Sequence, residues 1–573
     1  MEKVWLKHYD AGVPATIDYP KITFPQMLEE TARRFPEKTA IIFPGALGDS
    51  GKMSYKELNE QVNRLANALI DLGVKKGDRV ALLMPNCPQF VISYYAVLKA
   101  GGIVVAFNPL YAGREIEHQL NDCGAKVIIL LSLFYKTVAG LRERTGLRNV
   151  VVTNIKEYLP PVSRLLFTLL RERKEGHRAD IREAGATMAF RDLLEKFPPT
   201  PPSVAVDQND VAMFQYTGGT TGVSKGAVIT HRGPLANTCQ MRAWAAPVGV
   251  KDGEGMIMGV MPLFHVYGLV TVMHFAVLTG YTMVLLPRFI TKQVLKAINK
   301  YKPFFFPGVP TMYVAINNFP QVKKYNLRSI KACVSGAAPL PVEVQQKFEE
   351  LTGGKLVEGF GLTESAVVTH CTPILGLRKM GSIGVPFPDV ESRIMDIETG
   401  EKEMPMGEVG ELTIKAPQVM KNYWNRPEET ATVLRNGWLY TGDLARVDAD
   451  VYFFVVDRKK EMIIAGGYNI YPREVEEVLY EHEKIKEAVC YGVPDAYRGE
   501  TVKVAIVLKE GQTATPEEIT EYCRTKLAKF KVPKLVEFRQ ELPKSPIGKV
   551  LRRVLVEEEK KKAKPESGKA KGG

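Results

Sequence analysis

The segment "YTGGTTGVSKG" (216–226) contains the residue types that bind phosphate. Its glycines let backbone N–H groups approach an anion, its hydroxyls can donate hydrogen bonds to phosphate oxygens, and Lys225 supplies positive charge. A Walker loop places lysine after glycine and a hydroxyl after lysine, whereas the order here is Ser224-Lys225-Gly226. The segment directly follows an apolar run, where α/β sheets place their ligands. We therefore predict a phosphate-binding loop that is not a Walker loop.

Three further segments place reactive side chains among glycines and prolines. In "GFGLTES", Thr363 can donate a hydrogen bond to phosphate and Glu364 offers a hard oxygen ligand for Mg²⁺. In "YTGDL", Asp443 has the acceptor oxygens that a ribose diol requires. The proline-bounded "LPKSPIGK" ends on Lys549, a long cationic side chain suited to neutralising charge on a reacting group. Each residue taken alone is more often a helix cap, a turn residue or a solvated charge, so the prediction depends on the set.

Length and composition limit the classes of protein. A chain of 573 residues requires about two to four domains, and 45% hydrophobic with 25% charged residues is typical of a soluble globular protein. The seven cysteines form no C-x-x-C pair, which argues against disulfides and zinc and for a reducing compartment. We identify no export signal. The net charge of +13 lacks a basic module with interleaved aromatics, so we expect no nucleic-acid partner.

Helical and strand patterns alternate along most of the chain. Apolar runs such as "RVALLMP", "GIVVAF" and "KVIILL" alternate with helical patterns, which predicts buried parallel strands covered on both faces. The pattern returns after residue 210, with strands expected at 211–218, 282–287, 304–310, 331–336 and 355–361. We expect an α/β fold with this organisation: α/β subdomains over 1–205 and 206–390, a small β-barrel over 391–456, a small mobile α+β domain over 457–556, and a disordered charged tail over 557–573.

Two apolar segments raise the question of membrane contact. The run 256–287 lacks charged residues and is long enough to span a bilayer, but internal prolines, glycines and histidines break it, so we expect buried core. In 161–178, five leucines and valines share one helical face, beside five basic and two acidic residues. This could be a membrane-surface helix. We favour a helix packed on its own domain.

The motifs together resemble the acyl-adenylate-forming superfamily, which includes acyl-CoA synthetases, firefly-type luciferases and nonribosomal peptide adenylation domains. The resemblance rests on the loop at 216–226, "EGFGLTES", "YTGDL", "DRKKEMIIAGGYNIYPREVE" and "LPKSPIGKVLRR", all in family order, and on "LANALIDLGVKKGDRVALLMPN" near the N-terminus. It implies a two-step reaction in which a carboxylic acid attacks the α-phosphate of ATP and a thiol then displaces AMP. It implies ATP, coenzyme A and Mg²⁺ as cosubstrates and cofactor.

The resemblance also implies roles for individual residues. Lys549, Glu364, Thr363 and His265 would be catalytic, and Lys460 would be the hinge about which the small domain rotates. The metal ligands would be Thr217 and Glu364. The residues that would bind ATP or coenzyme A are Thr217, Gly218, Gly219, Thr220, Thr221, Gly222, Lys225, Gly336, Ala337, Glu358, Gly359, Phe360, Gly361, Asp443, Arg458, Gly466 and Gly467. Some relatives have lysine where Ile464 stands, so a second lysine contact from that strand is not expected.

The acyl substrate is predicted less sharply. Relatives that activate amino acids carry an aspartate in the segment matching "PLFHVYGL" (262–269), whereas Phe264-His265 offers no anion, which favours an uncharged acyl tail. We expect a fatty acid of medium or long chain, with an aryl acid (4-coumarate type) or an acyl-AMP ligase that loads a carrier protein as alternatives. We expect a cytoplasmic protein; peripheral contact with the inner face of the membrane and a homodimer are left open.

Overall fold

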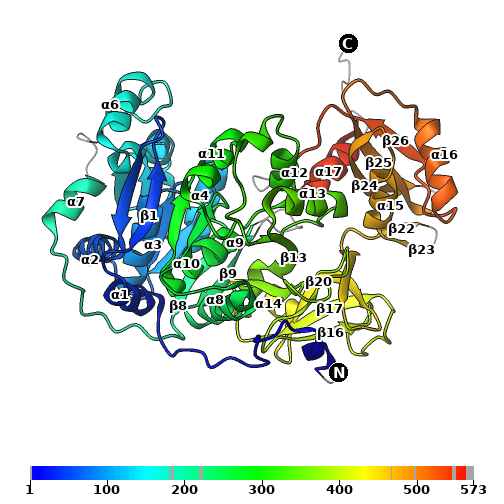
Figure 1. Ribbon diagram of the computed structural model, residues 1–573, viewed down its shortest axis with the longest axis horizontal. Coiled ribbons are helices and arrows are strands. Elements are labelled where there is room, and N and C mark those ends of the chain that lie inside the picture. The colour runs from blue at the N-terminus through cyan, green and yellow to red at the C-terminus, as the bar shows by residue number, and fades with distance from the viewer. Residues whose placement is uncertain are drawn as a thin grey trace, which may run out of the picture. The chain divides into compact units, whose positions relative to one another are not determined.

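The computed structural model describes residues 3–179, 181, 186–217, 224–465, 468–495, 498–544 and 550–562 (Figure 1). The chain divides into two compact units. Unit 1 comprises Met1–Ser392 and Ile414–Leu439, and unit 2 comprises Arg393–Thr413 and Tyr440–Gly573. The chain therefore passes from one unit to the other more than once. The domain boundaries expected from the sequence stay a prediction.

The largest sheet of unit 1 has eight strands in the order β18-β9-β8-β4-β3-β5-β6-β7. The strands from β8 to β7 run parallel, and β9 and β18 extend the sheet with antiparallel pairs. Because β3 and β5 are buried along nearly their whole length, their residues after Arg79 are apolar rather than alternating. The strands are β3 (Arg79–Leu83), β4 (Ile103–Ala106), β5 (Val127–Leu131), β6 (Asn149–Thr153), β7 (Thr187–Ala189), β8 (Val211–Thr217), β9 (Lys225–Thr230) and β18 (Asn422–Tyr423).

Helices predicted between these strands are present. The helix α2 (Tyr55–Asp71) begins with a capping box in which Ser54 accepts from the Glu57 N–H, and it buries Leu58, Val62 and Leu65. Because α3 (Pro88–Lys99) is buried on every side, it lacks a polar face. The remaining helices that pack in this part are α1 (Phe24–Arg34), α4 (Gly113–Cys123), α5 (Tyr135–Ala139) and α7 (Phe190–Lys196). The parallel α/β arrangement expected from the sequence is confirmed.

Two four-stranded sheets complete the core of unit 1, in the orders β10-β11-β1-β2 and β12-β13-β14-β15. The prediction of a strand at 304–310 is wrong, because the segment contributes only isolated bridges, at Phe305 and Gly308. Pro307 lies between them and has no N–H to donate to a ladder. The strands are β1 (Thr39–Pro44), β2 (Ser50–Ser54), β10 (Met256–Gly259), β11 (Thr282–Leu285), β12 (Ala332–Ser335), β13 (Lys355–Leu362), β14 (Val367–Cys371) and β15 (Val385–Pro386). The helices are α8 (Arg232–Ala245), α11 (Thr291–Tyr301), α12 (Pro310–Asn317) and α13 (Val342–Thr352).

The long apolar run 256–287 is broken as predicted. Between β10 and β11 it forms α9 (Val266–Gly268), a π-helix (Leu269–His274) and α10 (Phe275–Thr279). Nearly all of these residues are buried. Within the described ranges, no helix combines the length and the apolar character needed to cross a membrane.

The helix α6 (Pro161–Leu170) differs from expectation. It lies at the edge of unit 1, where its Ser163 is buried and donates to Asp49 Oδ1 at 2.6 Å. Its apolar face points outward: the exposed fractions are 58% for Val162, 59% for Leu165 and 70% for Leu169. The helix packs on its own domain through Ser163, as expected, but four of the five apolar residues of its predicted face are exposed.

Unit 2 contains two antiparallel-rich sheets. The first places β16 (Glu391–Met395), β17 (Gly410–Lys415), β20 (Trp438–Val447) and β21 (Phe453–Arg458) side by side. The second has the order β23-β22-β25-β24, with β26 beside β25. Its elements are β22 (Ile463–Ala465), β23 (Tyr468–Ile470), β24 (Ile485–Asp495), β25 (Gly499–Leu508), β26 (Leu535–Phe538), α15 (Pro472–Tyr480), α16 (Pro516–Lys526) and α17 (Arg552–Lys562).

The tail expected to be disordered from 557 begins as helix instead. The helix α17 continues to Lys562, with ion pairs between Arg553 and Glu557 at 3.3 Å and between Glu559 and Lys562 at 2.7 Å. Such pairs three and four residues apart stabilise a helix even where few residues are apolar. The rest of the tail, 563–573, lies outside the described residues.

Candidate active site

The predicted phosphate loop connects the antiparallel strands β8 and β9. Thr217, the last residue of β8, pairs with Lys225, the first residue of β9. Ser224 Oγ donates to the Thr217 carbonyl at 2.9 Å, which closes the base of the loop. The ladder thus fixes where the loop leaves and re-enters the sheet. The predicted residues Gly218, Gly219, Thr220, Thr221 and Gly222 lie outside the described residues.

A segment 200 residues downstream adds a short strand to the open edge of this hairpin. In β18, Tyr423 pairs with Ala227 of β9, and the next N–H, from Trp424, donates to the Gly226 carbonyl at 2.8 Å. Lys225 Nζ lies 5.5 Å from the centre of the Tyr423 ring. It also lies 3.6 Å from Glu429 Oε1, with its own side chain only 15% exposed. The lysine of the phosphate loop is therefore held by an aromatic face and a carboxylate from another part of the chain.

Asp122 joins the end of β8 to the 423–430 segment. Its carboxylate accepts from the Tyr216 hydroxyl at 2.5 Å and from Arg426 Nη2 at 3.2 Å, while its carbonyl accepts from the Trp424 indole at 2.9 Å. Burial, reinforced by nearby Cys123 and by Asp122, raises the pKa of Tyr216, so its hydroxyl stays a hydrogen-bond donor. Since Tyr216 immediately precedes Thr217, the carboxylate fixes the start of the loop relative to the 423–430 segment.

The candidate metal ligand Glu364 belongs to the same assembly. Its Oε1 accepts from the Tyr423 hydroxyl at 2.6 Å, and its carbonyl accepts from the Met420 N–H at 2.7 Å. Tyr423 therefore contacts Glu364 through its hydroxyl and lies beside Lys225 through its ring. The structure thus brings together the predicted residues Thr217, Lys225 and Glu364.

The turn that carries Thr363 and Glu364 has an unusual backbone. Thr363–Ser365 form a single 3₁₀ turn after β13, followed by positive φ angles of 51° at Ala366 and 121° at Val367. A positive φ at a β-branched valine is sparsely populated and persists where packing enforces it. Gly361 permits this fold-back, because a Cβ there would lie 1.3 Å from the Val367 carbonyl oxygen. The glycine is required by this close approach of two backbone segments.

The predicted residues Gly336, Ala337 and Glu358 lie at the ends of neighbouring strands. Gly336 follows β12, Ala337 has a positive φ of 67°, and Glu358 lies in β13, which pairs in parallel with β12. The Glu358 Oε2 accepts from the Leu340 N–H at 3.3 Å. Gly359 and Phe360 continue β13 and pair with β14. These residues therefore share the carboxyl edge of one sheet, where α/β folds bind ligands.

His265 caps a helix. Its Nδ1 accepts from the Tyr267 N–H at 3.1 Å at the start of α9. Because a backbone N–H can only donate, the neutral imidazole carries its proton on Nε2. The ring is half-buried, and the Tyr267 hydroxyl two residues on donates to the Val334 carbonyl at 2.6 Å, close to Gly336. A structural role of His265 in capping is thus established, while its catalytic role stays a prediction.

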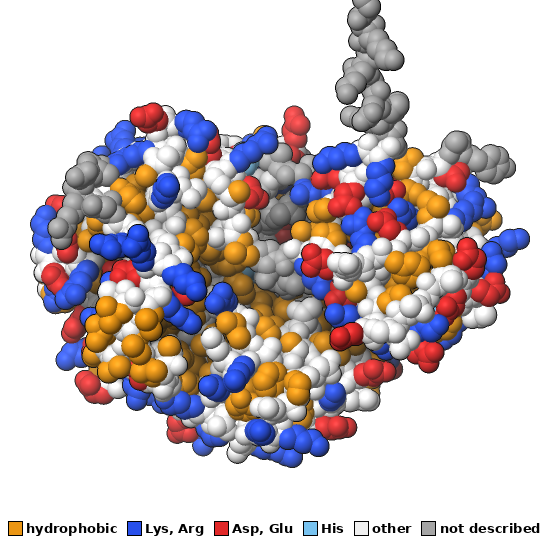
Figure 2. Space-filling view, turned by 90° about the horizontal axis from the view of Figure 1, so that it is seen from above, with side chains coloured by type: hydrophobic (Ala, Val, Ile, Leu, Met, Phe, Trp, Pro, Cys, Tyr) orange, Lys and Arg blue, Asp and Glu red, His pale blue; other side chains and the backbone are white. Residues whose placement is uncertain are grey.

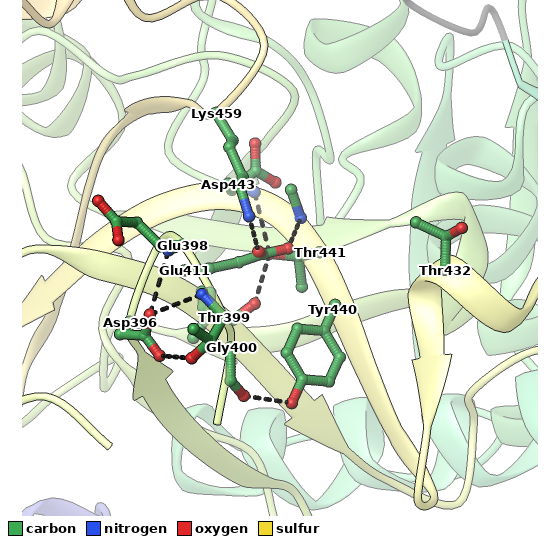
Figure 3. Close-up of polar contacts among 12 residues, drawn as sticks. Asp396, Glu398, Thr399, Gly400, Glu411, Thr432, Tyr440, Thr441, Asp443 and Lys459 are labelled. Carbon is green, nitrogen blue, oxygen red and sulfur yellow. Dashed lines mark hydrogen bonds and ion pairs between the residues drawn. The ribbon is translucent and has the colours of Figure 1, made fainter. Parts of the chain in front are cut away.

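Asp443, the residue predicted to bind the ribose, lies in unit 2 (Figure 3). Asp443 is 4% exposed, and its Oδ1 accepts from Arg458 Nε at 2.9 Å across the β20–β21 ladder. Next to it, Lys459 Nζ donates to Glu411 Oε2 at 2.9 Å, and the other oxygen of Glu411 accepts from the Gly442 N–H at 3.0 Å. The two residues that the resemblance assigns to nucleotide binding, Asp443 and Arg458, are therefore joined by a direct hydrogen bond; their binding role stays a prediction.

A buried ionic cluster surrounds the predicted hinge. Arg552 donates to Asp457 at 3.5 Å, to Glu476 at 2.8 Å and to Glu461. Burial raises the pKa of Asp457 and of Glu476, although the guanidinium opposes both shifts. Arg552 thus ties the segment around exposed Lys460 to the start of α17. The predicted residues Lys549, Gly466 and Gly467 lie outside the described residues.

The donors in unit 1 fit Mg²⁺ bound mainly through a nucleotide. Thr217 and Glu364 offer hard oxygen ligands, and among the described residues no cluster of three or more histidine, cysteine or acidic side chains could hold a metal by itself. Mg²⁺ commonly uses one or two protein oxygens together with substrate phosphates and water. This chain would therefore hold the ion with Glu364 and Thr217.

Sequence reasoning missed four residues of these assemblies. Tyr423, Glu429, Asp122 and Arg552 are distant in sequence from the groups they contact. Arg552 lies in the segment "LPKSPIGKVLRR", which carries the family resemblance but gave this arginine no role. For Tyr423 and Glu429 the signal was the polar, proline-containing run "NYWNRPEET" (422–430), which interrupts the turn-rich region without matching a motif used above. Residues that act by contacting another side chain carry no spacing signal of their own.

Comparison with known proteins shows the family. Residues 28–424 match the family described as AMP-binding enzyme, and residues 474–549 match the AMP-binding enzyme C-terminal domain. A long-chain-fatty-acid–CoA ligase of Bacillus subtilis (strain 168) is 48% identical over 561 residues, covering 97% of this chain and 98% of that protein. The chain belongs to the AMP-binding enzyme family.

Solved structures share the fold. The crystal structure of ATP-bound MatB from Rhodopseudomonas palustris superposes with a TM-score of 0.81 at 27% identity, covering 95% of this chain and 100% of that chain. The anthranilate CoA ligase AuaEII in complex with anthranoyl-AMP gives 0.80 at 27% identity, covering 94% and 97%. The mixed α/β fold predicted from the sequence is that of these ligases.

Proposed function

We propose that this chain is an ATP-dependent, AMP-forming fatty acid–CoA ligase with a long- or medium-chain substrate. The observation that carries the proposal is the assembly of Thr217, Lys225 and Glu364, held together by Tyr423, in a chain 48% identical to a long-chain-fatty-acid–CoA ligase. The substrates would be a fatty acid, ATP and coenzyme A.

The reaction would proceed in two balanced steps. The carboxylate oxygen attacks the α-phosphorus of ATP, the bond to the bridging oxygen breaks, and pyrophosphate leaves with that electron pair. The thiolate of coenzyme A then attacks the acyl carbon and AMP leaves, which gives the thioester. Because phosphoryl transfer needs positioning and charge stabilisation, residues that orient phosphate would contribute most of the rate enhancement.

The roles of individual residues follow from their chemistry. Thr217 and Lys225, with Gly218, Gly219, Thr220, Thr221 and Gly222, would hold the β- and γ-phosphates. Thr363 would donate to the α-phosphate, and Mg²⁺ at Glu364 and Thr217 would neutralise phosphate charge. Gly336, Ala337 and Glu358 to Gly361 would lie beside the adenine.

Unit 2 and the C-terminal residues would supply the remaining contacts. Asp443, oriented by Arg458, would accept from the ribose hydroxyls. Lys549 would stabilise charge at the α-phosphate and carboxylate during adenylation. Rotation about Lys460 would then exchange Lys549 for Gly466 and Gly467 beside the pantetheine. The large domain would end near 456 and the small domain would span 457–556.

An apolar cavity in unit 1 favours an uncharged acyl tail. Its walls come from α8, the 269–275 helix, β12 and β14, and they expose apolar atoms only. The lining residues include Trp244, Phe275, Phe305, Val334 and Val368. Val334 lies two residues before Gly336, so the cavity begins close to the predicted site. Its free space is about 50 Å³, far below the roughly 300–1,000 Å³ typical of pockets that hold small molecules. A long acyl chain would therefore have to move these side chains apart.

Two related activities remain as alternatives. An aryl-CoA ligase would use the same residues, because an apolar slot also accepts a ring, and AuaEII is an anthranilate CoA ligase of the same fold. An acyl-AMP ligase would transfer the acyl group to a carrier protein instead of coenzyme A. The small free volume gives no preference for a ring over a flexible chain that enters as the walls move.

The proposal is tested by pyrophosphate release across a panel of acids, with and without coenzyme A. The panel contains fatty acids of increasing length, cinnamic acids and amino acids. We expect the highest kcat/KM with a medium or long fatty acid. Formation of the thioester product should require coenzyme A. Best turnover with an amino acid, or release that is indifferent to the acid offered, would refute the proposal.

We further propose a cytoplasmic enzyme that contacts the inner face of the membrane peripherally and that can form a homodimer. The exposed apolar face of α6 supports the membrane contact. Size-exclusion chromatography with light scattering tests the dimer, and a single monomeric mass at micromolar concentration would refute it.

A further inference from the structure

We propose that α6 and its flanking residues dock unit 1 on the surface of a bilayer that contains anionic lipids. The inference deepens the proposed function, since a ligase for long-chain acids would meet its poorly soluble substrate at a bilayer. The surface itself is argued from exposure, helix geometry and charge, none of which depends on catalysis.

The first observation is the concentration of exposed apolar side chains on one short helix. Val162, Leu165 and Leu169 follow one another at the spacing of a helix face, and Leu170 is 68% exposed at its end. The opposite side of the helix is anchored, because Ser163 is buried and bonds Asp49. The helix therefore has one attached side and one apolar side without protein cover.

The patch continues beyond the helix. A Cβ on Gly45 would lie 2.5 Å from Ser163 Oγ, so the turn between β1 and β2 adjoins α6. Leu47, near the tip of that turn, is 61% exposed. Figure 2 looks onto the side of unit 1 on which α6 lies in Figure 1, and it shows hydrophobic side chains gathered there beside Lys and Arg. Contiguous apolar patches with a polar rim mark interaction surfaces.

The second observation is the charge around the patch, which identifies the occupant. Residues 161–178 carry five basic and two acidic side chains. Glu172 is paired with Lys156 at 2.7 Å and Glu175 lies 3.7 Å from Arg171. Both acidic groups are thus already matched. Arg173, Lys174 and Arg178 are exposed and have no ion pair within the described ranges.

This combination fits an anionic lipid surface better than a second protein. An amphipathic helix with leucine on one side and arginine and lysine at its rim inserts its apolar side below the headgroups and leaves its cations beside lipid phosphates. The helix is only 10 residues long, so it would lie in the interface rather than span the bilayer. The hydrogen bond between Ser163 and Asp49 anchors the other side of α6 to unit 1 and would keep the helix parallel to the membrane.

The test is co-sedimentation of the full chain with vesicles, in the absence of ATP and acyl substrate. We expect binding to phosphatidylglycerol–phosphatidylcholine vesicles and a loss of at least about tenfold in partitioning for Leu165→Glu/Leu169→Glu, because both leucines would carry charge into the bilayer. The matched control is Leu375→Glu/Leu377→Glu, which places the same charges at leucines 55% and 51% exposed beside the N-terminal segment. The control should bind like the unchanged protein.

A second variant separates charge from burial. Arg173→Gln/Lys174→Gln/Arg178→Gln should weaken binding to anionic vesicles several-fold and reduce its salt dependence, while binding to pure phosphatidylcholine stays as weak as before. Circular dichroism melting and pyrophosphate release with a short, soluble acid show that each variant is folded.

Several outcomes would overturn the proposal. They are absence of vesicle binding by the unchanged protein, equal binding by the Leu165→Glu/Leu169→Glu variant, and a change from dimer to monomer in that variant, which would assign the patch to a second copy. Because binding is measured without turnover, loss of the docking surface and failure of the proposed ligase activity give different results.

Discussion

The contact between Lys225 and Glu429 leads to a prediction with a definite sign. If Lys225 binds the departing phosphates, Glu429 competes with them for its charge. At 3.6 Å the pair is worth about 1 kcal/mol in a water-like medium, and exposed pairs measure about 0.2–1 kcal/mol. Glu429 is 41% exposed, so the lower values apply. Replacing Glu429 by Gln should therefore strengthen pyrophosphate binding by about 1.4- to twofold at low salt.

The assay is isothermal titration of pyrophosphate with Mg²⁺ present, on four proteins that form a double-mutant cycle. These are the unchanged chain, Glu429→Gln, Lys225→Ala and the double variant. The gain should disappear in the Lys225→Ala background and shrink at high salt. Glu428→Gln is the matched control, because it removes the same charge from an exposed neighbour in α14 (Pro427–Val433). An unchanged or weakened affinity in Glu429→Gln, or a gain that persists without Lys225, would refute the reasoning.

Three further changes have expected outcomes. In a urea titration, Gly361→Ala should lower the free energy of unfolding by about 3 kcal/mol or more, because its Cβ would meet a backbone oxygen. The control Gly146→Ala, whose Cβ would meet nothing within 4 Å, should change the free energy of unfolding by less than about 1 kcal/mol. Arg552→Gln should cost about 3–5 kcal/mol. Burial raises the pKa of two of the three carboxyls that Arg552 contacts, Asp457 and Glu476, so their protonation favours the folded state at low pH. The loss should therefore be larger at pH 8 than at pH 5, and equal losses would contradict this. Lys549→Ala should abolish acyl-AMP formation yet leave thioester formation from supplied acyl-AMP, and equal loss of both would contradict its assigned role.

Much of the fold follows from local pattern. Apolar runs between helical patterns correctly predicted β3, β4, β5, β8, β11 and β12, because a strand buried on both faces is apolar along most of its length instead of alternating. The segment 304–310 has the same apolar character but contains Pro307, and it forms only isolated bridges. Hydrophobicity predicted its burial, whereas the missing N–H decided its hydrogen bonding.

The candidate site was predicted in part, from the residue types in its motifs rather than from apolar patterns. Thr217, Lys225 and Glu364 lie in motifs whose residue types are typical of phosphate-binding and metal-binding sites. Tyr423 has no such motif: its strand β18 is two residues long, too short for any periodicity, and its role depends on contacts with Glu364 and Lys225. The exposure of α6 could not be read from sequence either, because an apolar helix face looks the same whether protein or solvent covers it.

The antiparallel ladder that closes the phosphate loop also sets how freely the loop can vary in length. Thr217 and Lys225 are held opposite one another by β8 and β9, so the ends of the loop meet whatever lies between them. The entropy of loop closure rises only slowly with length, by about 0.6 kcal/mol for each doubling. The fold can therefore accept longer or shorter loops here at little cost in stability. Under the proposed function, variation in this loop would be restrained by the geometry that phosphate requires rather than by folding.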